Sequence, residues 1–248
     1  MSAPTFVSPV TPERALSDKL NAVITKRSNG NPRSKQSHIG PSEIGEQCVR
    51  KLSYRLLEWD KVNTSNDPWA SVCGTAIHTW LASAFKADKS TKWLVEHKVT
   101  IDGKPGGSLD LFDVDSGTVI DHKCVGATSM KSRKAEGPTE QQIIQLNMYG
   151  YGLEQEGHSV SKIALAFYPF GGLLSSTHIW IGDYDRQVAL DAISRLDATR
   201  QLIVALDPEQ SPERWNLIPA STSMLCTWCP WFIPNSTDLS KGCPGGSA

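Results

Sequence analysis

A tight turn between two short apolar stretches is the feature that most constrains this chain. The turn Asp115-Ser116-Gly117 separates residues 108–114 from residues 118–125, and this pattern predicts a hairpin of two strands. Hydrophobic periodicity elsewhere predicts helices over residues 10–27, 41–59, 69–86, 138–154 and 184–206, and strands over residues 93–101, 162–168 and 176–181. The order of the core elements is then helix, three strands, helix, strand, which predicts an α/β fold with further helices before and after the core.

The length of 248 residues fits one domain with appendages. We expect a helical N-terminal region with a mobile basic loop over residues 1–67, a core over residues 68–206, and an irregular tail over residues 207–248. The tail is rich in Pro, Trp and Cys and is too poor in core residues to fold without a metal staple.

The composition excludes several classes of protein. No apolar stretch approaches the roughly 18 residues that a membrane span needs. The N-terminus, Met-Ser-Ala-Pro-Thr-Phe-Val, lacks the build of a secretory signal, so we expect a cytoplasmic protein, in the host cytoplasm if a phage encodes it, without structural disulfides. The net charge of −1 does not indicate nucleic-acid binding, so such a role has to come from local charge or from metal ions.

The predicted hairpin carries charged residues that face one another. Asp121 and Lys123 are two residues apart on the second strand, so both point to the same face of the sheet. Asp110, on the first strand, can reach that face across the hairpin. Two carboxylates suit a hard, oxygen-binding ion such as Mg²⁺ or Mn²⁺, and Lys123 is placed to hold a water beside a phosphate.

The alternative for this group is a surface hairpin with solvated charges. Against it, Asp121 ends an apolar run in a strand that should be at least half buried, and buried carboxylates are costly unless they are paired or metal-bound. His78 stands alone on an otherwise apolar predicted helix, where a satisfied core histidine is the alternative to a third metal ligand. Glu96, on the first strand, is interpreted as a solvated residue, with a supporting role at the metal as the alternative.

Four spaced motifs resemble the RecB-like branch of the PD-(D/E)xK nucleases. They are Gly-x-x-x-His ending at His78, Gly-x-x-Asp ending at Asp110, Asp-x-Lys from Asp121 to Lys123, and Gln-x-x-x-Tyr formed by Gln145 and Tyr149. The resemblance implies the α/β core of that family, a mixed central sheet flanked by helices. Two positions depart from the motif of the family name: Leu109 precedes Asp110, and the second acid is Asp121 where many relatives carry Glu.

The same resemblance implies the residues of the site. The ligands of the divalent metal would be His78, Asp110, Asp121 and the backbone carbonyl of His122. Lys123 would position the attacking water and stabilise the charge of the transition state. Gln145 and Tyr149, one turn apart on the following helix, would orient the phosphate or the DNA backbone.

The cysteines carry a second resemblance. Cys226 and Cys229 form a Cys-x-x-Cys motif in the tail, Cys243 follows them, and Cys48 precedes the core. This arrangement resembles that of iron–sulfur RecB-type nucleases, among them the CRISPR-associated RecB-like exonucleases, their phage exonuclease relatives and AddB-type nuclease domains. The resemblance implies a [4Fe–4S] cluster on these four cysteines, and Zn²⁺ at the same thiolates is the alternative.

Other residues have simpler interpretations. Cys73 and Cys124 lie within apolar elements and are interpreted as small core residues, and Trp80 and Trp180 are interpreted as large ones. Contacts to DNA would come from basic residues in two stretches, which are Arg50, Lys51 and Arg55, and, beside the hairpin, Lys131, Arg133 and Lys134.

The resemblance implies a Mg²⁺- or Mn²⁺-dependent deoxyribonuclease. It would be an exonuclease that hydrolyses the phosphodiester bonds of single-stranded or end-bearing DNA in phage or prokaryotic recombination, repair or replication. Two alternatives stay open: a non-catalytic DNA-binding or adaptor protein that keeps the fold and the cluster, and a structure- or sequence-specific endonuclease. The expected partner is DNA, with self-association or proteins of recombination and replication as further partners, and no membrane.

Overall fold

The computed structural model of the chain describes residues 11–29, 39–64, 67–102, 104–221 and 224–246. Most of the predicted basic loop, residues 30–38, lies outside the described residues. Among the helices that the structure describes, none has the length and hydropathy of a transmembrane segment.

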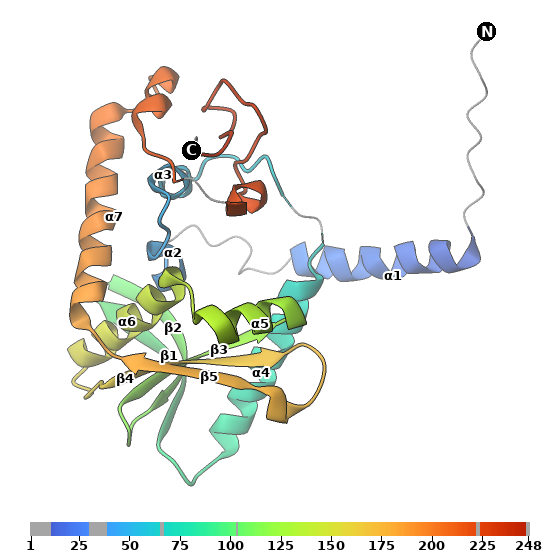
Figure 1. The fold of residues 1–248 in the computed structure, drawn as a ribbon, viewed down its shortest axis with the longest axis vertical. Helices are drawn as coiled ribbons and strands as arrows, with labels where there is room; N and C mark the ends of the chain where they lie inside the picture. Colours follow the sequence, from blue (N-terminus) through green and yellow to red (C-terminus); the bar gives the residue numbers. More distant parts are fainter. Residues whose placement is uncertain (1–10, 30–38, 65–66, 103, 222–223, 247–248) are drawn as a thin grey trace.

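A mixed five-stranded sheet forms the centre of the molecule (Figure 1). Its strands, in spatial as well as chain order, are β1 (Trp93–Ile101), β2 (Lys104–Asp113), β3 (Thr118–Val125), β4 (Lys162–Pro169) and β5 (His178–Asp183). Only β3 and β4 pair in parallel, and the other neighbours are antiparallel. The mixed sheet flanked by helices is the fold that the sequence predicted.

The parallel pair requires a crossover, because two parallel strands cannot be joined by a tight turn. The crossover contains two helices, α5 (Ala127–Glu136) and α6 (Glu140–Gln155). α6 corresponds to the helix predicted over residues 138–154, whereas α5 was not predicted. α6 begins at a capping box in which Thr139 accepts from the Gln142 amide and Gln142 bonds back to the Thr139 amide.

Helices cover both faces of the sheet. In β3 the side chain of Asp121 contacts Gln145 of α6, while the His122 ring stacks on Phe85 of α4 (Trp69–Ala87), with ring centroids 5.5 Å apart. Successive side chains of a strand point to opposite faces, so α6 and α4 lie on opposite sides of β3. A last helix, α7 (Arg186–Leu206), packs on α6 through a cluster that includes Ile144, Ala189 and Leu196.

The single helix predicted over residues 41–59 is wrong. The structure has a short α2 (Pro41–Ile44) and a separate α3 (Val49–Leu56). Gly45 ends α2 against α6, where a Cβ would lie 2.9 Å from the Gln141 backbone. Cys48 then adopts an extended conformation and caps α3, its sulfur accepting from the Lys51 amide.

The predicted first helix is present as α1 (Pro12–Asn29), but it buries none of its residues. The predicted core position of Trp80 is wrong, since its side chain is 69% exposed. α4 turns Leu81 and Phe85 toward the sheet instead, and this leaves the adjacent position outside. Trp180, also predicted as a core residue, packs against the main core but is only half-buried.

The irregular tail folds over α3 rather than over the sheet. Short 3-10 turns, η3 (Pro212–Leu217) and η4 (Met224–Trp228), are followed by a bridge that pairs Phe232 with Cys243. Tyr54 of α3 stacks on Trp215 and Trp231, with ring centroids 4.2 and 5.6 Å apart. The tail therefore has its own small apolar cluster, which includes no residue of the sheet.

Candidate functional site

A cleft opens where β2 and β3 separate. Their ladder pairs Asp113 with Thr118, Phe112 with Val119 and Leu111 with Ile120, and the strands diverge at the next residues, Asp110 and Asp121. The cleft has a volume of about 470 Å³. Its lining includes all of the side chains predicted for the nuclease site: His78, Asp110, Asp121, Lys123, Gln145 and Tyr149.

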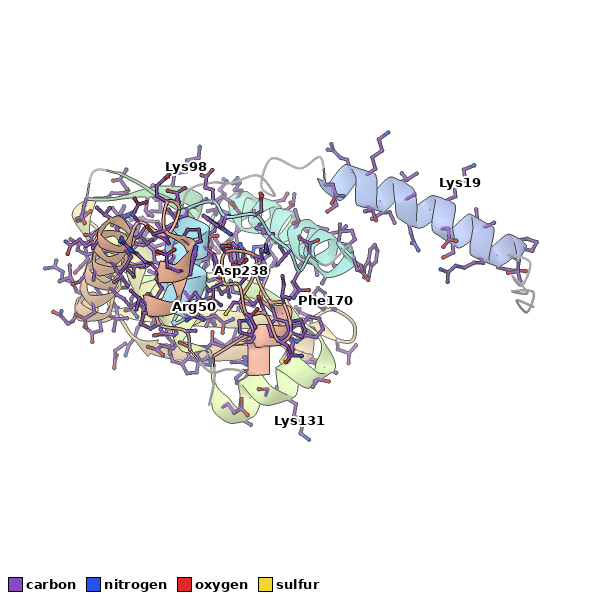
Figure 2. All side chains as sticks on the ribbon, turned by 90° about the horizontal axis from the view of Figure 1, so that it is seen from above. Lys19, Arg50, Lys98, Lys131, Phe170 and Asp238 are labelled. Carbon is purple, nitrogen blue, oxygen red and sulfur yellow. The ribbon has the colours of Figure 1, made fainter. Side chains whose placement is uncertain are left out.

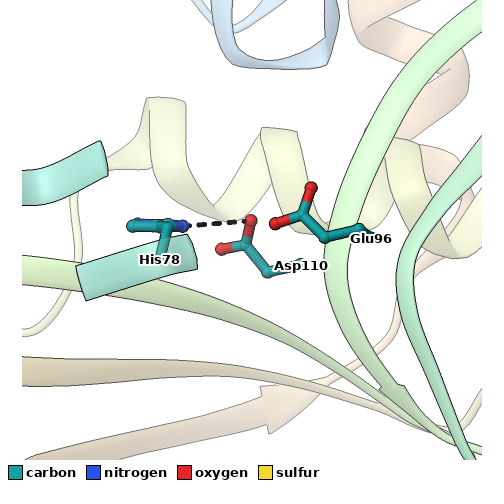
Figure 3. Close-up of side chains that lie close together, drawn as sticks. All are labelled: His78, Glu96 and Asp110. Atoms are coloured by element: carbon teal, nitrogen blue, oxygen red, sulfur yellow. Dashed lines mark ion pairs between the residues drawn. The ribbon is translucent and has the colours of Figure 1, made fainter. Parts of the chain in front are cut away.

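One set of donors surrounds Asp110 (Figure 3). Oδ1 of Asp110 lies 3.3 Å from Nδ1 of His78, which α4 places over the open end of the hairpin. Oδ2 accepts a hydrogen bond of 2.8 Å from the backbone amide of His122. Ligand atoms of His78, Glu96 and Asp110 all lie within 4.8 Å of one another, which makes this the compact set of metal donors among the described residues.

Asp121 lies beside this set and has different partners. Its carboxylate is 4% exposed, and Oδ2 lies 2.5 Å from the ammonium of Lys123. Oδ1 accepts a hydrogen bond of 3.0 Å from the side-chain amide of Gln145. The amine predicted beside the carboxylates is therefore in contact with the second of them.

The electrostatics of the two carboxylates differ. Burial raises the pKa of Asp121 to about 6, although the neighbouring Lys123 ammonium opposes this shift. Burial alone would also raise the pKa of Asp110, but the hydrogen bond and charge of His78, with the His122 amide, outweigh it and hold the pKa below its usual range. The bond to Asp110 in turn raises the pKa of His78. One buried carboxylate is thus well compensated and the other is not.

α6 supplies the third wall of the cleft. Gln145 and Tyr149 are one turn apart on this helix and are both nearly buried, at 8% and 6% exposure. Burial raises the pKa of the Tyr149 hydroxyl, so it remains a hydrogen-bond donor in the cleft. The i, i+4 spacing of the Gln-x-x-x-Tyr motif accounts for their common direction.

Glu96 is the residue that the sequence interpretation undervalued. Its backbone has a φ of 51°, which an L-residue other than Gly, Asn or Asp rarely adopts. The β1–β2 register passes from Val95 to His97 without pairing it, and its side chain points to His78 and Asp110 rather than to solvent (Figure 3). The only signal in the sequence was an acid on the strand next to Asp110, which is a weak one.

The residues of the cleft fit a divalent cation. Imidazole and carboxylate donors converge from α4, β1 and β2, and such donors suit Mn²⁺ and Mg²⁺. The buried Oδ2 of Asp121 is paired with the Lys123 ammonium and has no further hydrogen-bond partner among the described residues. The site holds more negative charge than its own residues neutralise, which a bound cation would correct.

The four predicted cluster cysteines also lie together. Cys48, Cys226, Cys229 and Cys243 line one cavity of about 280 Å³, which we call the thiol cavity. Cys48 comes from the start of α3 and the other three from the tail. Cys73 and Cys124, in α4 and β3, are half-buried and lie outside this cavity.

Charged residues of both signs surround the thiol cavity. Arg50 donates to the sulfur of Cys243 at 3.5 Å and to the Ile218 carbonyl at 2.8 Å. Lys51, Tyr54, Glu46 and Glu140 also line the cavity, and the Lys51 ammonium lies 2.5 Å from the Glu46 carboxylate. Arg50 is thus the cation in direct contact with one of the four thiols, and the deprotonated forms of these thiols bind metals.

The sulfurs are spread more widely than in a zinc site. In a tetrahedral Zn²⁺ site with bonds of about 2.3 Å, the sulfurs lie about 3.8 Å apart. Among the described residues, no three of the cysteine sulfurs fall within 4.8 Å of one another. The thiol cavity thus leaves room for a group larger than a single ion.

The helix α6 lines both the cleft and the thiol cavity. Thr139 and Gln141, at the start of α6, line the thiol cavity, whereas Gln145 and Tyr149 line the cleft. α2 packs against this helix, and the side-chain amide of Gln141 donates a hydrogen bond of 2.6 Å to the Ser42 carbonyl. The cleft and the thiol cavity are therefore built on shared elements.

Comparison with known proteins identifies the fold. No family model and no curated protein matches the chain. An alkaline exonuclease (LHK-Exo) from Laribacter hongkongensis has a similar structure, with a TM-score of 0.50 and 13% identity over 75% of this chain and 97% of that one. Two other solved structures are more distant. The complex of LHK-Exo with dAMP has a TM-score of 0.45 and 14% identity over 70% of this chain and 95% of that one. A phage-related exonuclease from Haemophilus somnus 129PT has a TM-score of 0.45 and 12% identity over 65% of this chain and 82% of that one. At this identity the first likeness establishes a common fold.

Proposed function

We propose that the chain is a divalent-metal-dependent nuclease that hydrolyses phosphodiester bonds of DNA in the cleft. The observation that carries the proposal is the convergence, from separate elements, of His78, Asp110 and Asp121 with the amine of Lys123. The shared fold with an alkaline exonuclease supports DNA as the substrate and an exonuclease as the type of enzyme. We propose single-stranded or end-bearing DNA as its substrate.

Each side chain then has a role. His78, Glu96 and Asp110 would hold the cation, and Asp121 and the His122 carbonyl would complete its ligands. The chemistry that Mg²⁺ or Mn²⁺ supplies in such a site is to lower the pKa of a bound water and to offset the charge of the phosphate. Lys123 orients the attacking water and stabilises the negative charge that develops on the phosphate. Gln145 keeps Asp121 in place, and Tyr149 donates a hydrogen bond to the DNA backbone.

We further propose that the thiol cavity holds a [4Fe–4S] cluster. The spacing of the four sulfurs supports this group over Zn²⁺, and the Arg50 guanidinium, which contacts the Cys243 sulfur, would offset part of its negative charge. Its role is structural: it joins α3 to a tail that has only a small apolar cluster, so that the binding energy becomes folding energy.

The test is hydrolysis of labelled linear DNA with Mn²⁺ or Mg²⁺ by the wild type and by Asp110→Ala, Asp121→Ala and Lys123→Ala. Each variant should lose cleavage and keep its circular dichroism spectrum. Lys98→Ala, an exposed substitution on β1, should cleave like the wild type. Cleavage by Asp121→Ala at the wild-type rate would refute the proposal. Circular DNA added to the same reaction should survive if the enzyme is an exonuclease and be cut if it is an endonuclease.

A further inference from the structure

A second and larger groove lies next to the cleft. It has a volume of about 770 Å³ and runs between α5 and the segment that follows β4. Its floor begins at Val125 and Gly126, directly after the strand that carries Asp121 and Lys123. At about 3.3 Å per residue, Val125 is roughly 7 Å from Lys123 along the strand. The end of a chain that lies on the floor of this groove is therefore roughly 7 Å from Lys123 of the cleft.

Contacts with the hydrophobic core and with β3 fix the two walls of the groove. Met130 anchors α5 in the main hydrophobic cluster, so its neighbours on the helix face outward. On the other side, the amide of Phe170 donates a hydrogen bond of 3.1 Å to the Val125 carbonyl, which fixes Phe170 beside the end of β3. Both walls are thus tied to the strand that leads to the cleft.

The groove is positively charged. Lys131 and Lys134 are three residues apart on α5 and both line it, and no carboxylate is among the lining residues. Neither lysine has an ion-pair partner among the residues that the structure describes. Since the whole chain has a net charge of −1, two unpaired lysines on an acid-free surface are a local excess that matches phosphates.

The groove also offers an aromatic ring. Phe170 lines it and is 43% exposed, in a region where Pro169 and Ala135 supply further apolar surface. Proteins that bind single-stranded nucleic acid combine two features: basic side chains that contact the phosphate backbone, and an aromatic ring on which a base stacks. In a duplex the faces of the bases are already stacked, so only an unpaired strand can use the ring of Phe170.

We infer that this groove binds single-stranded DNA and leads its end to the cleft, with Lys131 and Lys134 on the phosphates and Phe170 under a base. The choice of DNA rests on the proposed nuclease function. Figure 2 shows Phe170 on the same part of the molecule as α5, while Lys98 projects from the opposite side from Lys131. Lys98 therefore provides a matched control.

The test is fluorescence anisotropy of the full chain with labelled oligothymidylate in buffer without divalent ions, where binding is measured without cleavage. The double substitution Lys131→Glu/Lys134→Glu should weaken binding and lower the slope of log K against log salt by about 1.4, at about 0.7 per phosphate contact. Lys98→Glu should bind like the wild type. Equal affinity of the double variant and the wild type would overturn the inference.

Phe170→Ala should weaken binding about 5- to 150-fold, the factor that corresponds to roughly 1–3 kcal/mol for a stacked base. Phe170→Tyr, which keeps a ring, should restore the affinity, and failure of this rescue would show that stacking is not involved. If the groove variants lose binding but no form of the protein cleaves DNA, the groove is upheld and the nuclease is refuted. If they bind and cleave normally, the nuclease stands and the groove is refuted.

Discussion

The side-chain amide of Gln145 in α6 donates a hydrogen bond of 3.0 Å to Oδ1 of the buried Asp121 in β3. This contact joins the crossover helix to the strand that carries the second acid. It also leaves the Lys123 ammonium as the partner of Oδ2, which has no further hydrogen bond among the residues that the structure describes. Several properties of the protein should depend on this arrangement.

Asp121→Asn should stabilise the metal-free protein. Burial raises the pKa of Asp121 from an ordinary value of 3.8 to about 6, so the folded chain binds this proton more tightly than the unfolded chain. The stabilisation from protonation is complete below pH 3.8 and is lost as the pH rises through about 6. At neutral pH the variant should therefore be more stable by about 3 kcal/mol. Urea unfolding of both proteins between acid and neutral pH measures the difference.

In the same experiment, Mn²⁺ should stabilise the wild type and have little effect on the variant, because the ion needs the charge of Asp121. A stability difference that does not change with pH would contradict the assigned environment of this carboxylate.

Gln145→Ala should slow cleavage by about 10- to 100-fold, the usual effect of removing a partner that orients a metal ligand. Without the amide, Asp121 loses a hydrogen bond to its charged form, so its pKa should rise and the pH profile of cleavage should move to higher pH. Gln201→Ala, on the exposed side of α7, is the matched control. A lower rate with an unchanged pH profile would mean that Gln145 acts elsewhere.

Glu96→Gln should lower the affinity for Mn²⁺ by at least about tenfold, since it removes a charged donor from the set with His78 and Asp110. Calorimetric titration of the metal measures this. Glu96→Gly removes the same carboxylate but tolerates the φ of 51°, so its metal-free form should be about 1 kcal/mol more stable than that of Glu96→Gln. Wild-type affinity in both variants would exclude Glu96 from the metal site.

Cys226→Ser should remove the visible absorption of the anaerobically purified protein and lower its melting temperature. Cys73→Ser and Cys124→Ser lie outside the thiol cavity and should keep the spectrum. Iron and sulfide analysis completes the measurement. A colourless wild type with one bound zinc would replace the proposed cluster by a zinc site.

Gly45→Ala should destabilise the fold by about 1–3 kcal/mol, because the new Cβ would overlap the Gln141 backbone at the α2–α6 contact. Gly74→Ala is the control within α4, where a Cβ meets no atom within 4 Å. It should be neutral or stabilising by about 0.5–1 kcal/mol. Thermal unfolding distinguishes the two, and equal melting temperatures would contradict the close packing of α2.

Much of the sheet could be predicted because its strands alternate or are continuously apolar between clear turns. β3 and β4 are examples, with Val119, Ile163 and Leu165 in the core. The break between α2 and α3 was missed because the apolar periodicity continues through it, although Gly45, which ends α2 against Gln141, is a local signal for it. α5 was missed for a related reason: Met130 is its only buried residue, too few for a periodic pattern.

The resemblance to the nuclease motifs pointed to the residues of the candidate site, and spacing placed Asp121 and Lys123 on one face of their strand. Glu96 escaped this reasoning, since its inward direction depends on a positive φ that the sequence does not indicate. Trp80 was misplaced because the apolar stripe of α4 was assigned one position away from Leu81. In an almost uncharged helix, composition alone does not reveal which side faces the sheet.

The contacts of α6 with both the thiol cavity and the cleft fix the number of residues between Gln141 and Gln145. Gln141 touches α2 and the thiol cavity, and Gln145 reaches Asp121 only one turn later. Each α-helical residue turns the chain by about 100° and advances it by about 1.5 Å. Insertion or deletion of a single residue between these two glutamines would rotate one of them away from its partner. Homologues that keep both the cleft and the thiol cavity should therefore have insertions and deletions in the loops on either side of α6, and never between these two glutamines.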